Sequence, residues 1–337
     1  IDTKTKSLKT YMNKDIQYTL YEIATNKLGF LPDDKINIGL IAIDNHTAGI
    51  LGIFGNRTAN KKTINNVPVK RHMASTMKPL IDYLPYFEKT TASPGEVVID
   101  EEYNYSDGTS LKNWDSIYKG AISLRQALKE SRNIPALKIF KKTSKEVKIE
   151  TLSRLGLTVP NDLYEADAIG CGNGLYSLFE VSNAYLAFAN NGKFKKASCI
   201  LNDDPFLQVI KPSSAFFINS ILHDVFSKSK FVPKNTYMMA KTGQTNYDKK
   251  TALKYNIPSN ATKESFVISY TKDITFGCYV MNKFQTNVGS PDTPSNIEKQ
   301  KCIIKDNVLY LDESGIYEYF IKDALPPRYK EHNYIKI

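Results

Sequence analysis

Apolar residues repeat at helical spacing near the start of the chain and in strand-like runs directly after it. Residues 14–28 follow a possible helix cap at Asn13, and their apolar positions share one helical face. Those positions are Ile16, Leu20, Ile23, Ala24 and Leu28. Residues 36–44 and 50–55 are apolar runs of strand length. The short glycine-containing turn at 45–49 predicts that they form a hairpin.

Helical periodicity dominates the middle of the chain, from about 73 to 226. A helix is predicted around 122–130, and Pro135 fits the first turn of the next helix, because a residue there needs no N–H donor. Residues 177–180 have the capping-box pattern that begins a helix. A further helix is predicted after Pro212.

Strand character returns at 236–241, 265–270 and 275–281, and the tight turn 271–273 joins the last two runs. Strands therefore occupy both ends of the sequence, with helices between them. The simplest architecture is an α/β fold of the α+β type. In it, an antiparallel sheet formed from both chain ends is flanked by helices and carries an inserted, mostly helical lobe.

Composition and charge narrow the possible functions only slightly. The 337 residues carry a formal net charge of +10, which suits an anionic partner, although a lysine-rich solvated surface is the simpler interpretation. No zinc-finger spacing or RNA-binding aromatic signature supports a nucleic-acid partner. No C-x-x-C or H-E-x-x-H motif occurs, so we expect no metal and no cofactor. The four cysteines are Cys171, Cys199, Cys278 and Cys302. Buried free thiols are the simplest interpretation, although an even number of cysteines also permits disulfides.

Ser75 and Lys78, three residues apart, carry the first candidate chemistry. Positions i and i+3 share a helical face, and Pro79 is tolerated only near a helix start, so Ser75 is predicted to begin a helix. Free N–H groups there suit an oxyanion, and a partly buried lysine can lose its proton and act as a base. The spacing alone is weak, because three other serines also precede a lysine by three positions: Ser116, Ser227 and Ser269.

Two further motifs give the first one its meaning. Ser131 and Asn133 form S-x-N at a predicted break between helices, where a serine can relay a proton and an amide can hold a substrate amide. K-T-G at 241–243 ends a strand-like run, and a glycine in a strand indicates close approach of a ligand or another backbone. S-x-N and K-T-G each occur once in the chain. The order S-x-x-K, S-x-N, K-T-G is the motif set of penicillin-binding proteins and class A β-lactamases.

Longer stretches extend this match. The chain resembles the transpeptidase domain of class A penicillin-binding proteins over about residues 10–285. Residues 74–79 are similar to that family's G-S-T-F-K-P, and residues 131–136 to its S-R-N-I-P-A. Residues 184–190 resemble its A-Y-A-x-F-A-N helix, and residues 266–271 resemble the F-V-G-Y-T strand that follows K-T-G.

The resemblance implies a serine D,D-transpeptidase that cross-links peptidoglycan stem peptides. In the family mechanism, Ser75 attacks the carbonyl of the penultimate D-alanine and Lys78 takes its proton. Ser131 and Lys241 then relay a proton to the departing D-alanine. An acceptor amine from a neighbouring stem attacks the acyl-enzyme, and β-lactams mimic D-alanyl-D-alanine and leave Ser75 acylated.

The resemblance also implies a substrate-binding set. Asn133 would hold the donor peptide amide, and Thr242 would bind the terminal carboxylate. The oxyanion would lie between the backbone N–H groups of Ser75 and Gln244. The implied substrate-binding residues are Thr242, Gly243, Gln244 and Thr245.

Three features depart from the family pattern. Gln244 stands where the family has a threonine, so a hydroxyl on the substrate carboxylate is lost and acylation by penicillin is predicted to be slower. Residues 246–263 look like an insertion beside the site, which either covers the site, meets a partner or is simply a mobile polar loop. Met77 replaces the usual phenylalanine, which changes packing only.

Three other activities are compatible with the same nucleophile. A D,D-carboxypeptidase differs only in using water as the acceptor. A sensor or scaffold would bind β-lactams without turnover. A β-lactamase needs a base for its deacylating water; Glu165 is a candidate by chain order alone, because residues 164–167 do not resemble the class A loop.

We therefore divide the chain into a linker with an N-terminal helix (1–35), a transpeptidase domain (36–305) and a C-terminal tail of unknown role (306–337).

No stretch approaches the ~18 apolar residues of a membrane span. Because the sequence starts at Ile1 rather than Met, we interpret it as a piece of a longer protein with an upstream anchor. The resemblance places it on the extracytoplasmic face of the bacterial membrane. Whether a glycosyltransferase domain lies upstream stays open. The implied partners are stem peptides, an acceptor amine, β-lactams and other cell-wall synthesis proteins.

Overall fold

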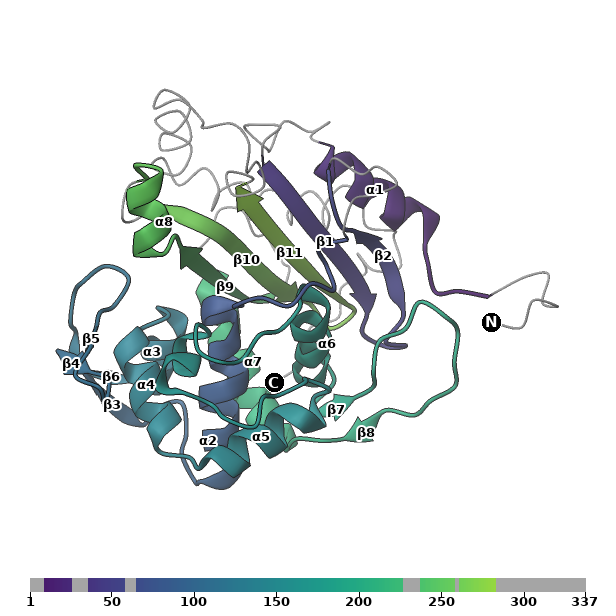
Figure 1. Cartoon of the computed structure of the whole chain (residues 1–337). Helices are drawn as coiled ribbons and strands as arrows, with labels where there is room; N and C mark the ends of the chain where they lie inside the picture. The colour runs from purple at the N-terminus through teal and green to yellow at the C-terminus, as the bar shows by residue number, and fades with distance from the viewer. Residues whose placement is uncertain (1–8, 26–35, 58–64, 227–236, 258–260, 283–337) are drawn as a thin grey trace.

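Strands from the early and late parts of the sequence pair in one five-stranded antiparallel sheet (Figure 1). The computed structural model describes residues 9–25, 36–57, 65–226, 237–257 and 261–282. The strand order is β2 (Ile50–Phe54), β1 (Ile36–Asp44), β11 (Ile274–Asn282), β10 (Thr262–Tyr270) and β9 (Met239–Asn246). The β1–β11 register runs from Ile36 opposite Asn282 to Asp44 opposite Ile274. The predicted sheet built from both chain ends is confirmed.

Short polar side chains close the two predicted hairpins. The carboxylate of Asp44 accepts hydrogen bonds from the backbone N–H groups of His46 (2.9 Å) and Thr47 (3.0 Å) at the end of β1. The hydroxyl of Thr271 accepts from the N–H of Asp273 (3.2 Å) between β10 and β11. Such local bonds are why Asp and Thr favour turns, and they explain why both hairpins were predictable.

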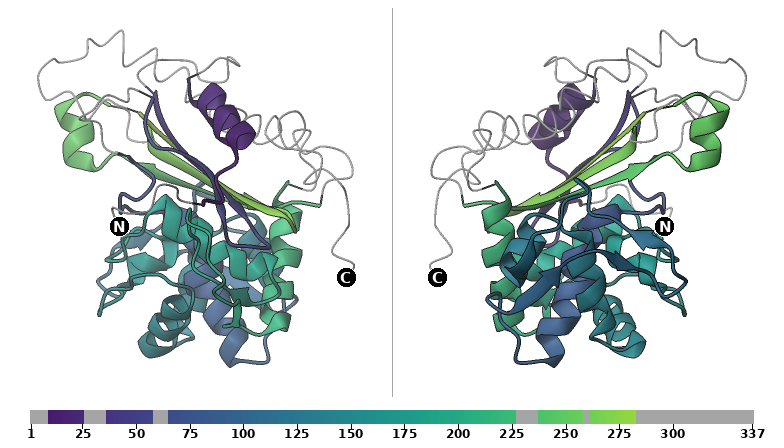
Figure 2. Two further views of the ribbon diagram at one scale, coloured as in Figure 1. Left: turned by 90° about the vertical axis from the view of Figure 1, so that its right-hand side faces the viewer. Right: turned by 90° about the vertical axis from the view of Figure 1, so that its left-hand side faces the viewer.

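Helix α1 (Lys14–Ala24) covers one face of the sheet (Figure 2). The side chain of Asn13 caps it by accepting from the N–H groups of Asp15 and Ile16, as predicted. Its apolar face packs on residues from β1, β2 and β11 in a core of its own. Leu28, predicted to extend this face, lies outside the described residues.

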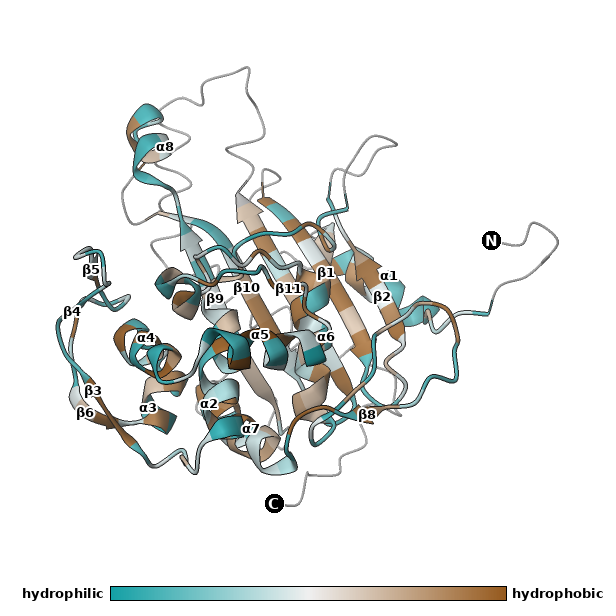
Figure 3. Cartoon of the chain, turned by 60° about the horizontal axis from the view of Figure 1, so that its bottom comes forward, coloured by the Kyte–Doolittle hydropathy of each residue, from teal (hydrophilic) through white to brown (hydrophobic). Residues whose placement is uncertain are grey.

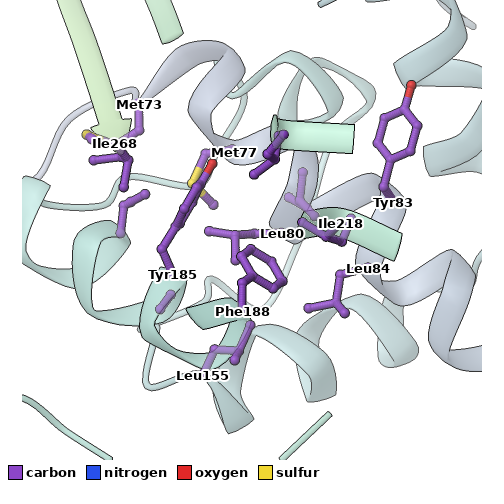
Figure 4. Packing of buried hydrophobic residues seen from close by; sticks show 14 of the residues in the cluster. Met73, Met77, Leu80, Tyr83, Leu84, Leu155, Tyr185, Phe188, Ile218 and Ile268 are labelled. Carbon is purple, nitrogen blue, oxygen red and sulfur yellow. The ribbon is translucent and has the colours of Figure 1, made fainter. Parts of the chain in front are cut away.

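A helical lobe covers the opposite face of the sheet (Figure 2). Helices α6 (Leu178–Ala189) and α7 (Pro212–Phe226) lie against the strands, and α2 (Leu84–Lys89), α3 (Leu124–Lys129), α4 (Asn133–Lys141) and α5 (Lys145–Arg154) surround them. The core between them is apolar and aromatic, with Tyr185 and Phe188 ring centroids 5.4 Å apart (Figure 4). Figure 3 shows the matching apolar character of the central strands. Among the described residues, the lobe also contains three two-stranded antiparallel sheets: β3 (Val97–Asp100) with β6 (Gly120–Ser123), β4 (Tyr103–Asn104) with β5 (Ser110–Leu111), and β7 (Lys193–Phe194) with β8 (Leu207–Gln208).

The helix starts in the lobe follow their capping signals. The predicted capping box is present: Ser177 Oγ accepts from the N–H of Glu180, and Glu180 accepts from the N–H of Ser177. The helix after Pro212 is also confirmed. The helix predicted from residue 122 is wrong at its start, because Ile122 pairs with Val98 in β6. The helix begins at Leu124, after Ser123 caps it.

The inserted segment between β9 and β10 has regular structure. Helix α8 (Lys249–Lys254) is capped by Asp248, which accepts from the N–H of Thr251 (2.9 Å). Tyr247, Ala252 and Ala261 form a small buried cluster beneath it. The part of this insertion from Lys249 to Lys254 is therefore a capped helix rather than the loop of the simpler interpretation, and it lies beyond the ends of the strands (Figure 1).

Strand β9 lies directly against the short helical turn η1 (Ala74–Met77). A Cβ atom on Gly243 would lie 3.0 Å from the Met73 carbonyl oxygen and 3.0 Å from the Thr76 nitrogen. Glycine permits this close approach without displacing the facing backbone, as its place in K-T-G indicated. The K-T-G residues lie inside β9 rather than at the end of a strand, which corrects the predicted boundary; residue 236, the predicted start, lies outside the described residues.

The substitution Gly243→Ala is expected to destabilise the fold, because the new methyl group meets backbone atoms that cannot rotate away. We expect the free energy of unfolding to fall by about 1–3 kcal/mol, as in other overpacked sites. Chemical denaturation measures this. The control is Gly95→Ala, where the nearest atom to a Cβ is the Ser93 hydroxyl oxygen at 3.7 Å. Equal losses in the two variants would contradict the close approach.

Candidate active site

Ser75 lies on a sharp, strained turn that is held from both sides. The preceding residue, Ala74, has φ 47°, in the left-handed region that non-glycine residues rarely adopt. The N–H of Ala74 donates to the Gly170 carbonyl (3.2 Å), and the Tyr185 hydroxyl donates to the Thr76 carbonyl (2.7 Å). Because its neighbours are buried and pinned while Ser75 is partly exposed, the turn presents the serine side chain.

The helix that begins at Ser75 is not a regular α-helix as predicted. It starts as the 3₁₀ turn η1 and continues as the π-helical segment η2 (Pro79–Tyr83) before α2. Pro79 has no N–H to donate, so the α-helical ladder is interrupted there. In a 3₁₀ turn, residues i and i+3 stack directly above one another. Ser75 and Lys78 have this relation, and the N–H of Lys78 donates to the Ser75 carbonyl.

Lys78 is fully buried and bound by the S-x-N motif. Its Nζ donates to the Ser131 carbonyl oxygen (2.7 Å) and to Asn133 Oδ1 (2.7 Å), and Ser131 Oγ lies 3.4 Å away. Burial lowers the pKa of Lys78 to about 7, although the charge of Asp82 opposes this. A neutral amine is therefore available near neutral pH, which is what a general base requires.

Lys241 reaches the same serine from the sheet. Its Nζ donates to Ser131 Oγ (2.8 Å) and to the Thr242 carbonyl (2.9 Å). Burial, and then the positive charge of Lys78, hold the pKa of Lys241 well below its ordinary value. The three motifs thus meet around one hydroxyl, with a lysine on each side of Ser131.

A buried polar cluster around Arg132 supports the S-x-N turn. Ser131 has φ 57°, so the chain turns sharply between α3 and α4. The Arg132 guanidinium donates to Asp100 (2.9 Å), to Asp115 (2.7 Å) and to the Ile117 carbonyl. Sequence reasoning missed this cluster, because Arg132 is visible inside the motif but nothing local identifies its distant partners.

Asn113 completes that support. Its Oδ1 accepts from the N–H of Asn133 (2.8 Å), and its Nδ2 donates to Asp100 (2.7 Å). The side chain of Asn133 donates to the Lys112 carbonyl (2.8 Å) and accepts from Lys78. Both ends of the Asn133 amide are therefore oriented before any substrate enters.

The predicted substrate-binding residues lie along β9, which is the edge strand of the sheet. Thr242 is partly exposed, and the Gln244 side-chain amide lies 3.4 Å from Ser265 Oγ. Thr245 differs, because its hydroxyl donates to Glu264 (2.9 Å), which also pairs with Arg71 (3.1 Å). The hydroxyl proton of Thr245 is thus directed across the sheet, and its predicted contact with substrate stays a prediction.

Glu165, the candidate base of a β-lactamase, is occupied by other partners. Its carboxylate accepts from the Ser106 hydroxyl (2.6 Å), the Ser106 N–H (2.7 Å) and Lys141 Nζ (2.6 Å). Partial burial opposes ionisation, but hydrogen bonds from Lys141 and Ser106 outweigh it and lower the pKa of Glu165 to about 2. So acidic a group is a poor base, and this arrangement disfavours a deacylating role.

Cysteines and ligand clusters add no further chemistry to the described residues. Cys171 and Cys199 are free thiols in loops and are exposed, so the expectation of buried thiols is wrong for these two. Cys278 is buried, as expected, and Cys302 lies outside the described residues. Within the described ranges, no group of three His, Cys, Asp or Glu side chains is placed to hold a metal ion. No described helix has the length and apolar character to cross a bilayer.

The sequence matches the penicillin binding protein transpeptidase domain over residues 38–293. The chain belongs to this family. It is 31% identical over 301 residues to penicillin-binding protein 1A/1B of Bacillus subtilis, covering 82% of this chain and 32% of that protein. It is 28% identical over 274 residues to penicillin-binding protein 1A of Streptococcus oralis, covering 72% and 42%. The chain thus spans less than half the length of these class A relatives.

Solved structures show the same fold at low sequence identity. PonA1 of Mycobacterium tuberculosis has a TM-score of 0.72 at 15% identity, covering 92% of this chain and 84% of that chain. Penicillin-binding protein 1A of Haemophilus influenzae has a TM-score of 0.65 at 18% identity, covering 87% and 48%. Penicillin-binding proteins of this family take part in peptidoglycan synthesis outside the cytoplasm.

The substitution Arg132→Met is expected to unfold or strongly destabilise this penicillin-binding protein domain. It leaves the buried carboxylate of Asp100 without its cation, a change that costs about 3–5 kcal/mol in comparable sites. Thermal and chemical denaturation measure the loss. The control is Arg125→Met, whose pair with Asp224 is partly exposed and contributes about 1 kcal/mol or less. Similar losses in both variants would contradict a special role for the buried cluster.

Proposed function

We propose that this chain is a serine D,D-transpeptidase that cross-links peptidoglycan stem peptides, with Ser75 as nucleophile. The observation that carries the proposal is the convergence of two buried lysines on Ser131 beside the Ser75 turn. Family membership and the motif order support the same activity. We also propose the domain bounds 36–305; the family match lies inside them, and the tail 306–337 lies outside the described residues.

In the acylation step, Ser75 Oγ attacks the carbonyl carbon of the penultimate D-alanine while its proton moves to the neutral amine of Lys78. The negative oxygen that forms is held by the backbone N–H groups of Ser75 and Gln244. Support for this pairing comes from the closeness of β9 and η1, since a Cβ on Gly243 would lie 3.1 Å from the Ser75 nitrogen.

The tetrahedral intermediate then breaks its carbon–nitrogen bond. The departing D-alanine amine takes a proton from Ser131 Oγ. The proton that Lys78 took from Ser75 then passes to Ser131, directly or through Lys241, so that Lys78 is a neutral amine again. The 2.8 Å bond from Lys241 to Ser131 supports this relay. The acceptor amine next attacks the ester carbonyl, loses its proton to Lys78 and forms the cross-link, and Ser75 regains its hydroxyl proton.

The edge of β9 is the proposed binding surface for the donor peptide. An extended peptide can pair with the free backbone groups of an edge strand. Thr242 would then bind the terminal carboxylate and Asn133 the peptide amide. β-Lactams would occupy the same place; PonA1, which shares this fold, has been solved in complex with penicillin V. The proposed setting is the extracytoplasmic face of a bacterial membrane.

The intact mass of the protein before and after incubation with penicillin tests the nucleophile, alongside Ser75→Ala. We expect a persistent added mass equal to that of the drug in the wild type and none in Ser75→Ala. No adduct but hydrolysed penicillin would indicate a β-lactamase. No adduct and intact penicillin would indicate an unreactive site, and both outcomes contradict the proposal.

A stem-peptide donor with and without an acceptor amine separates the remaining activities. A cross-linked product, absent in Ser75→Ala, supports the transpeptidase. Release of D-alanine without cross-linking would indicate a D,D-carboxypeptidase. Acylation by penicillin with neither peptide product would indicate a binding protein without turnover.

The substitution Gln244→Thr is expected to accelerate acylation by penicillin, because it restores a hydroxyl beside the substrate carboxylate. A hydrogen bond to a charged group contributes about 1.5 kcal/mol or more, which corresponds to roughly tenfold in rate. Time-resolved intact mass gives the rate. The control is Gln244→Val, which has the shape of threonine without its hydroxyl. If both variants react equally, or neither is faster than the wild type, the expected role of the missing hydroxyl is wrong.

A further inference from the structure

A nearly buried ion pair joins the sheet to the segment that leads into Ser75, and it takes no part in the chemistry proposed above. Arg71, four residues before Ser75, donates from Nη1 to Glu264 Oε1 (3.1 Å) and to the Tyr279 hydroxyl. Only 11% of the Arg71 side chain and 9% of the Glu264 side chain are exposed. Taking two charges out of water can cost as much free energy as their attraction returns, so stability alone does not explain the pair.

The place of Glu264 in the sheet is unusual for a charged residue. Phe266, Ile268 and Tyr270 of β10 belong to the core between the sheet and the lobe. Because side chains alternate along a strand, Glu264 ends this apolar row on the same face. A bulge between Thr262 and Glu264 shifts the register at this point, and bulges re-aim neighbouring side chains. The sheet therefore presents a carboxylate, rather than another apolar side chain, to the chain segment that faces it.

Glu264 also holds β9, the strand that carries K-T-G. It lies opposite Thr245 in the β9–β10 register, and its Oε2 accepts from the Thr245 hydroxyl (2.9 Å). Thr245 directly follows Gln244, whose backbone N–H is one of the two proposed oxyanion donors. The two oxygens of one carboxylate thus bind β9 on one side and Arg71 on the other.

The backbone of Arg71 is fixed as well as its side chain. Its N–H donates to the Tyr176 carbonyl (2.9 Å), and the N–H of Tyr176 donates to the Arg71 carbonyl (2.9 Å). Three residues later, the N–H of Ala74 donates to the Gly170 carbonyl (3.2 Å). The chain from Arg71 to Ala74 is therefore held at both ends, so a shift of Arg71 would displace the serine that follows.

The ion pair thus connects the two sides of the proposed oxyanion site. One donor, the N–H of Ser75, lies just after the segment that Arg71 fixes. The other, the N–H of Gln244, lies on the strand that Glu264 fixes. A Cβ on Gly243 would lie 3.1 Å from the Ser75 nitrogen, so strand and turn are in close contact here. Because two donors stabilise an oxyanion only when both reach it, their separation has to be fixed before the reaction.

We propose that Arg71 and Glu264 are positioning residues that set the separation of the Ser75 and Gln244 backbone N–H groups around the oxyanion. This inference rests on the proposed function of Ser75. It requires no contact between the pair and the substrate, because the pair acts through the two backbone segments. Charge-assisted hydrogen bonds are directional, so they fix orientation as well as distance, which apolar packing at this point would not.

The test replaces the whole pair in the double variant Arg71→Met with Glu264→Leu. Both charges leave together, so the domain is expected to fold with a melting temperature near that of the wild type. Acylation by a fluorescent penicillin is followed over a range of drug concentrations, which separates the rate constant of acylation from the Kd of the complex that precedes it. We expect the rate constant to fall about 10- to 100-fold and the Kd to change less than about twofold.

The matched control is the double variant Lys142→Met with Glu96→Leu. Glu96 likewise accepts from a cation, Lys142 (2.9 Å), and from a hydroxyl, that of Tyr86 (2.7 Å). This pair lies in the helical lobe, where Glu96 directly precedes β3. Both kinetic constants of the control are expected to equal those of the wild type.

The affinity for a boronic acid gives a second readout that a merely structural role would not change. Boron bonds to Ser75 Oγ, whose proton passes to Lys78, and a boron-bound oxygen then occupies the place of the oxyanion. We expect the Arg71 and Glu264 double variant to weaken this binding by the factor that slows acylation, as for a transition-state analogue. Unchanged boronic acid affinity in the folded double variant would overturn the inference.

Two single variants keep the test decisive if the double variant fails to fold. Glu264→Gln keeps the length of the side chain, and its amide can accept from Arg71 and donate to Thr245, so the rate constant is expected to stay within about threefold of the wild type. Glu264→Asp keeps the charge but is one methylene group shorter, so we expect a loss of about tenfold. A wild-type rate constant in Glu264→Asp would overturn the inference. No acylation of the wild type would instead overturn the proposed function.

Discussion

Two lysine side chains that the fold removes from water converge on one serine hydroxyl, and the rest of the site depends on this arrangement. An ammonium group in a dry interior is unstable unless fixed oxygens replace its water. The Ser131 carbonyl and Asn133 serve Lys78, and the Thr242 carbonyl serves Lys241. Two cations so close also repel each other. One neutral amine near neutral pH is the result, and it is available only while those oxygens keep their places.

The surrounding lobe fixes the positions of those oxygens. The strained backbone at Ala74 and Ser131 is stable only because neighbouring contacts fix it. The Arg132 cluster ties the S-x-N turn to strand β3, and Gly243 lets β9 lie against the Ser75 turn. Buried charges and positive φ angles lower stability, and the large apolar core between sheet and helices offsets them. The site is rigid because its supports are buried, which favours a preorganised reaction centre.

The family fold tolerates wide sequence change. The chain shares its fold with PonA1 at 15% identity, because apolar patterning and hairpin closure rather than particular residues build the sheet and lobe. The differences of this chain lie at the edge of the site, at Gln244 and in the α8 insertion. We expect substitutions there to alter which ligands fit and how fast they react, because they lie apart from the buried lysines.

The sequence by itself determined the local features: the two hairpins, the caps at Asn13 and Ser177, and the order of the three motifs. These depend on residues a few positions apart, and short-range hydrogen bonds decide them. Only the tertiary structure decided the 3₁₀ and π-helical form of the Ser75 segment and the hydrogen-bond partners of Arg132. It also decided the salt bridge between Glu165 and Lys141, and the burial of the Asp82 carboxyl group without a hydrogen-bond partner among the described residues. Each of these depends on which distant groups burial brings together, and the pKa of a lysine such as Lys78 follows from that burial rather than from its neighbours in the chain.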